Sequence, residues 1–71
     1  MTESELTRAI WKIAPLWVGG PTSDVEVRAI LKIAQRIRGF LAGRYDGRYG
    51  PPTKYPASIV AAAAVHEYYM S

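Results

Sequence analysis

The sequence contains no cysteine among its 71 residues. This absence excludes disulfide bonds, thiolate metal sites and catalysis by a cysteine nucleophile. A chain this short buries only about 60% of the surface that its unfolded form exposes. Because no covalent cross-link is available, the fold must rest on helix packing, with or without the support of a second copy or another partner.

Long hydrophobic runs are also missing. The longest one covers residues 59–65, far short of the roughly 20 apolar residues that span a bilayer. Residues 1–5 include two glutamates and no basic residue, so they lack the basic segment with which a signal peptide begins. We therefore predict a cytoplasmic protein with no membrane partner. The net charge of +3 suits contact with nucleic acid, contact with an acidic protein or plain solubility.

Motifs that carry catalysis are the third absence. The sequence has no nucleophile elbow, no phosphate-binding glycine loop and no paired carboxylates. His66 is the only histidine, and a zinc site needs further ligands at close spacing. We predict that the protein is not an enzyme and that it uses no metal, no cofactor and no small-molecule substrate.

Helical periodicity is the main positive signal. It predicts a single all-α domain over residues 1–71, with three helices at about 3–14, 24–42 and 56–70. The stretch between the second and third helices is rich in glycine, proline and tyrosine, which predicts a long loop. Loops of this length in a small domain are usually functional or disordered.

Local chemistry indicates where the helices begin and end. Thr2 with Glu5, and Ser23 with Glu26, have the spacing of a capping box, which marks a helix start. Pro15 has no N–H group to donate, so we expect it to kink the first helix or to end it at residue 14. Upstream of that point and just beyond it, apolar residues recur at helical spacing: Leu6, Ala9, Ile10, Ile13 and Trp17.

The second and third helices differ in how their apolar residues are distributed. In the second, apolar residues spread over roughly 200° of the helical wheel, which predicts that this helix is central and touches both others. The third is apolar almost all round, and Glu67 is its only formal charge. Either the rest of the chain covers this helix, or it forms the interface of a homodimer through Ile59, Ala62, Ala63, His66, Tyr69 and Met70.

A protein-binding surface is the first functional hypothesis. Trp11 lies about 100° away from the apolar side of the first helix, and an exposed tryptophan is a typical interface anchor. The loop adds further anchors at residues 43–56, where tyrosines alternate with cations. We assign partner binding to Trp11, Arg44, Tyr45, Arg48 and Tyr49. The alternative is that Trp11 packs within the chain and the loop tyrosines cover an undersized core.

Nucleic-acid binding is the second hypothesis. Arg28, Lys32 and Arg36 recur every four residues on one side of the second helix, and Lys54 adds a cation in the loop. Such a strip can follow a phosphate backbone, although an ordinary solvated helix face has the same pattern. The sequence therefore favours a small protein-binding module, monomeric or homodimeric, that acts as an accessory or inhibitory protein by occluding a partner surface; the alternative is a nucleic-acid-binding protein.

Overall fold

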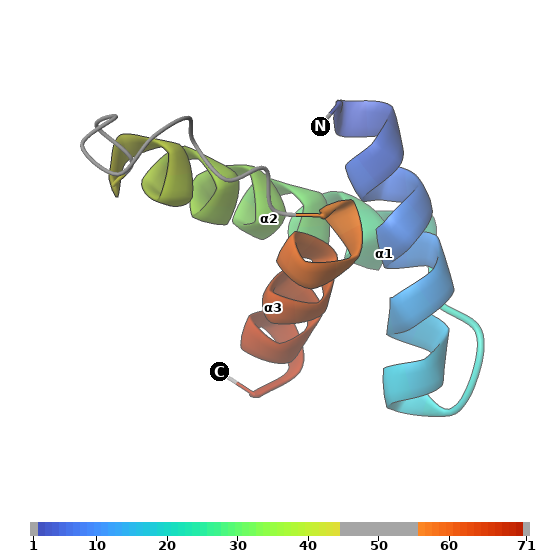
Figure 1. The fold of residues 1–71 in the computed structure, drawn as a ribbon. Helices are drawn as coiled ribbons and strands as arrows, with labels where there is room; N and C mark the ends of the chain where they lie inside the picture. Colours follow the sequence, from blue (N-terminus) through green and yellow to red (C-terminus); the bar gives the residue numbers. More distant parts are fainter. Residues whose placement is uncertain (1, 45–55, 71) are drawn as a thin grey trace.

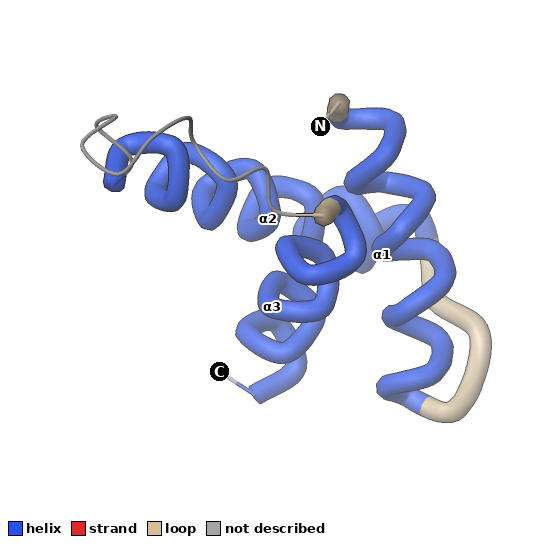
Figure 2. Tube along the Cα trace, in the orientation of Figure 1, coloured by secondary structure: helices blue, strands red, loops and turns tan. Residues whose placement is uncertain are grey.

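The computed structural model describes residues 2–44 and 56–70, in which all regular structure is α-helical. The helices are α1 (Glu3–Val18), α2 (Asp24–Arg44) and α3 (Ala57–Met70), and the described residues contain no strand (Figures 1 and 2). The predicted three-helix all-α fold is confirmed. The centre of the predicted long loop, residues 45–55, lies outside the described residues. None of the three helices has the length and apolar character needed to cross a bilayer.

The N-terminus of α1 is capped as its sequence predicts. The Thr2 hydroxyl oxygen accepts a 3.2 Å hydrogen bond from the Glu5 N–H group. The same hydroxyl donates to the Glu5 side chain over 3.3 Å. The first of these bonds satisfies one of the backbone N–H groups that a helix start leaves without a partner.

The predicted end of α1 at residue 14 is wrong, because the helix continues through Pro15 to Val18. Proline removes a single donor from the helical ladder, the one that would reach the carbonyl of Trp11. Leu6, Ile10 and Ala14 are all fully buried at four-residue spacing. Their burial holds the residue before the proline in helical register and outweighs the preference for an extended conformation there.

The true end of α1 depends on Gly19, which has a φ of 72° in the left-handed region. Its N–H group donates to the carbonyl of Pro15 over 2.9 Å, and the N–H group of Gly20 reaches the same oxygen over 3.2 Å. Glycine adopts this conformation without the steric cost that a Cβ atom brings. The short connection that follows leads directly into α2 (Figure 2).

Helix α2 begins after Ser23, whose hydroxyl oxygen accepts from the N–H group of Glu26 over 3.3 Å. It ends two residues later than predicted, at Arg44. Its C-terminal half extends beyond the other two helices (Figure 1), and the chain measures 42 × 23 × 16 Å along its principal axes. In this projecting half, Ile37 and Leu41 are half-buried and Phe40 is exposed.

Helix α3 starts one residue later than predicted, directly after Pro56. The carbonyl of Pro56 accepts hydrogen bonds from Ile59 and Val60 at 3.1 and 3.3 Å. Proline suits this place because it has no N–H group to leave unpaired and its φ is already helical.

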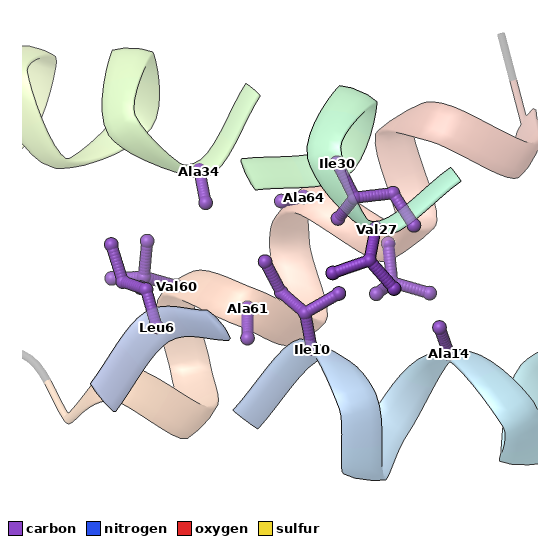
Figure 3. Packing of buried hydrophobic residues seen from close by; sticks show 10 residues of the cluster. Leu6, Ile10, Ala14, Val27, Ile30, Ala34, Val60, Ala61 and Ala64 are labelled. Atoms are coloured by element: carbon purple, nitrogen blue, oxygen red, sulfur yellow. The ribbon is translucent and has the colours of Figure 1, made fainter. Parts of the chain in front are cut away.

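The core brings the three helices together around α3. The expectation that α2 touches both other helices is confirmed, but its expected central place belongs to α3. Helix α3 packs more extensively on α1 and on α2 than these pack on each other. Its contribution consists of small or β-branched side chains, which let both neighbours approach closely. Figure 3 shows the core side chains of the three helices pointing toward one another. The buried residues are Leu6, Ile10, Ala14, Val27, Ile30, Ala34, Val60, Ala61, Ala64 and Val65.

Candidate interaction surface

One side of α3 is exposed along the whole length of the helix. The buried residues of α3 share the opposite side, which faces α1 and α2. The uncharged part of this exposed side, which we call the outer face, consists of Ile59, Ala62, Ala63, His66 and Met70, and the exposed Ser58 and Glu67 lie at its borders. Ile59 is 55% exposed and Met70 is 64% exposed. The two large apolar side chains therefore lie at opposite ends of the face, with Ala62, Ala63 and His66 between them.

The outer face continues onto the C-terminal end of α1. The rings of Trp17 and His66 meet edge to face, with centroids 5.4 Å apart and planes at 84°. This geometry is a favourable one for aromatic pairs. Leu16, Trp17 and Val18 all keep large exposed fractions, from 44% to 82%. The helical spacing of Trp17 placed it with the buried side of the first helix, but the structure leaves it half in solvent, at the end of the helix.

Tyr69 does not belong to the outer face, although the sequence grouped it there. It is half-buried, and its hydroxyl group donates a 2.8 Å hydrogen bond to Oε2 of Glu26 in α2. Its ring also meets Tyr68 edge to face, with centroids 4.9 Å apart. Burial, followed by the hydrogen bond and the negative charge of Glu26, raises the pKa of Tyr69 to about 12. Tyr69 thus fixes α3 to the start of α2.

Trp11 lies on a separate part of the surface. It is 40% exposed and lines an open depression of about 560 Å³ on α1 together with Glu3, Ser4, Thr7 and Arg8. Its predicted position off the apolar side of the first helix is confirmed. Its role as a partner anchor stays a prediction.

A second depression, of about 310 Å³, lies between α1 and the start of α3. Arg8, Lys12 and Glu5 contribute charged groups to it, and Ala57 and Ser58 border it from α3. Both depressions are open to solvent. Among the described residues, no polar or charged side chain is buried, and no group of three potential metal ligands occurs.

Of the basic residues predicted to contact a partner or nucleic acid, some lie within the described part of the structure and others outside it. Arg28, Lys32 and Arg36 are exposed on α2, on the side away from Val27, Ile30 and Ala34, which are buried. Arg44 is the last residue of α2, and its side chain is outside the described part. The loop residues proposed for partner or nucleic-acid contact, Tyr45, Arg48, Tyr49 and Lys54, lie outside it as well.

Comparison with protein-family models, with curated proteins and with solved structures finds no match to this chain. The geometry of the described residues is therefore the basis for assigning a function. Their most distinctive surface is the uncharged outer face of α3 with the adjoining end of α1.

Proposed function

We propose that this chain is a non-catalytic protein-binding module of the cytoplasm, which acts as an accessory or inhibitory protein by occluding the surface of its partner. The outer face of α3 and the adjoining end of α1 form the docking surface. The observation that carries the proposal is that the exposed, uncharged side chains of the outer face recur along α3 from Ile59 to Met70 and are extended by Trp17 through its contact with His66.

The energetics favour a protein as the ligand. Fully burying one large apolar side chain contributes roughly 1.5–3 kcal/mol. Ile59, Met70 and Trp17 each retain about half of their surface in water, so a partner that covers them gains on the order of 1 kcal/mol from each. A nucleic acid offers phosphates, for which this surface has no cation.

A pair of arginine substitutions tests the proposal. Ala63→Arg places a charge at the centre of the outer face, whereas Gln35→Arg adds the same charge at an exposed position of α2. Both positions are on the surface, and circular dichroism checks that both variants remain helical.

The readout is binding of partners captured from the native host and then purified. We expect isothermal titration calorimetry to show binding to the unmodified chain and to Gln35→Arg, and a loss of at least tenfold in affinity for Ala63→Arg. If Ala63→Arg binds the same partners with the same affinity, the outer face is not the docking surface and the proposal is wrong.

Nucleic-acid binding is the second candidate function, because Arg28, Lys32 and Arg36 are exposed in one row on α2. If all three contact phosphates of duplex DNA, the logarithm of the affinity falls with the logarithm of salt concentration with a slope of about −2.7. The triple variant Arg28→Glu, Lys32→Glu, Arg36→Glu then abolishes electrophoretic shifts. An absence of shifts with DNA and RNA at low salt eliminates this candidate.

A further inference from the structure

We propose that the partner that docks on the outer face is a second copy of this chain, with the two α3 helices packed antiparallel about a two-fold axis. This inference rests on the proposed function and names the partner of the same surface. Two properties of the outer face support it, namely its charge and its distribution of side-chain sizes, and its area indicates how strong the association is.

Charge favours self-association at this surface over other parts of the molecule. The chain carries a net charge of +3, so two copies repel each other wherever their basic surfaces meet. The outer face has no formal charge, and the nearest one on α3, Glu67, lies at its edge. Two copies can therefore approach through this face without placing like charges opposite each other.

The side-chain sizes make the face complementary to itself in one orientation. Ala62 and Ala63 are small, whereas Ile59, His66 and Met70 are large. In an antiparallel pair whose axis passes between residues 63 and 66, His66 of one copy lies over the alanines of the other. Ile59 of one copy then lies against Met70 of the other. A parallel pair instead stacks each large side chain on its own equivalent and leaves the alanines facing each other across a gap.

The area indicates a weak and reversible dimer. Helix α3 has 14 residues and is therefore about 21 Å long. Its face alone is smaller than the roughly 800 Å² per partner of a standard interface. The exposed side chain of Trp17, which contacts His66 at the border of the face, enlarges the contact. Small interfaces of this kind are typical of transient association, so we expect a dissociation constant in the micromolar range.

Disulfide cross-linking tests the arrangement directly, since the chain has no cysteine of its own. Positions 59 and 70 lie 11 residues apart, about 16 Å along a helix. A disulfide requires Cα atoms within about 7 Å. In the antiparallel dimer, Ile59→Cys therefore cross-links with Met70→Cys when the two variants are mixed. Each variant oxidised alone stays largely monomeric, as does the control Gln35→Cys on α2.

Three outcomes overturn the proposal. Cross-linking of Ile59→Cys with itself at the rate of the mixture contradicts the antiparallel orientation. If Gln35→Cys cross-links with itself as fast as the mixture of Ile59→Cys and Met70→Cys does, the thiols react by random collision and not within a specific dimer. Sedimentation equilibrium of the unmodified chain that fits a monomer up to high micromolar concentration excludes the dimer. We expect instead a monomer–dimer equilibrium that Ala63→Arg shifts at least tenfold toward monomer.

Comparing Ala63→Arg with the unmodified chain also shows whether the homodimer alone is wrong or the proposed function as well. If the unmodified chain is monomeric but Ala63→Arg still loses binding to purified host proteins, the outer face docks a different protein and only the homodimer is wrong. If Ala63→Arg changes neither self-association nor host-protein binding, both proposals fail.

Discussion

The hydroxyl group of Tyr69 in α3 donates a 2.8 Å hydrogen bond to Oε2 of Glu26 in α2. The sequence had placed Glu26 in a capping box with Ser23, and only one half of that box forms. The Ser23 hydroxyl accepts from the Glu26 backbone, while the Glu26 carboxylate serves Tyr69. The bond joins residues 43 positions apart and holds the C-terminal end of α3, so it orients the outer face toward solvent.

Removing this bond lowers stability by a modest amount. In Tyr69→Phe the ring remains for its contact with Tyr68, and only the hydroxyl is lost. A hydrogen bond of this kind contributes about 1 kcal/mol to the free energy of unfolding. We expect urea denaturation to show a loss of this size without a change in the slope of the transition. An unchanged midpoint means that the bond contributes nothing to stability.

The raised pKa of Tyr69 makes stability depend on pH in the alkaline range. The folded chain keeps the phenolic proton up to a pKa of about 12, whereas the unfolded chain releases it near pH 10. Between these values the folded state binds more protons, so the free energy of unfolding falls as pH rises. The contribution is complete below about pH 10 and is lost as pH rises through 12.

Glu26→Gln tests the cause of this shift. The amide oxygen can still accept the hydrogen bond, but the negative charge is gone. We expect the most alkaline step in the ultraviolet titration of tyrosine to move to lower pH in this variant, while burial and the retained hydrogen bond still keep the pKa of Tyr69 above its ordinary value. Tyr69→Phe serves as the control that identifies the step. A titration curve identical to that of the unmodified chain contradicts the role of the Glu26 charge.

Two leucines of α1 provide a matched test of the core. Leu6 is fully buried and Leu16 is 82% exposed. We expect Leu6→Ala to lower the free energy of unfolding by about 2–5 kcal/mol, because it leaves a cavity between the three helices. Leu16→Ala should change it by less than about 0.5 kcal/mol. Thermal and chemical denaturation measure both, and equal effects of the two substitutions contradict the packing of α1.

Alanine substitutions at Gly19 and Gly20 distinguish the cost of a strained backbone conformation from the cost of a steric clash. A Cβ atom added at either glycine meets no atom within 4 Å, but only Gly19 has a left-handed φ. We expect Gly19→Ala to cost about 1 kcal/mol of stability because of this backbone conformation alone. Gly20→Ala should be close to neutral. If chemical denaturation finds the two variants equally stable, Gly19 does not terminate α1 in the way described.

Pro15 lies inside α1, which continues past it for three more residues, to Val18. Pro15→Ala restores the missing N–H group opposite the carbonyl of Trp11, and alanine favours the helical conformation. We expect the free energy of unfolding to rise by about 1 kcal/mol, the gain being limited by the greater freedom of the unfolded chain. A destabilised Pro15→Ala variant implies that the proline ring makes a packing contact that matters more than the lost hydrogen bond.

The sequence by itself determined the three helices and, to within one residue, where each begins. Thr2, Ser23 and Pro56 act through chemistry confined to a few neighbouring residues, so their roles follow from local spacing. The absence of cysteine and of catalytic motifs is also a property of the sequence alone. The path of α1 through Pro15 was not predictable in this way, because the burial of Ala14 against other helices overrode a local preference.

Only the tertiary structure decided which helix is central and which surfaces remain exposed. Counting apolar residues favoured α2, but α2 extends past its neighbours, and the small side chains of α3 let both other helices approach. Helix α3 is apolar on all sides, so no periodicity could assign its faces. Packing assigned them, turning Ala61 and Val65 inward, directing Tyr69 to Glu26 and leaving Ile59, Ala63 and Met70 exposed. A face becomes a candidate interface only when the chain itself leaves it uncovered, and that depends on contacts between residues far apart in sequence.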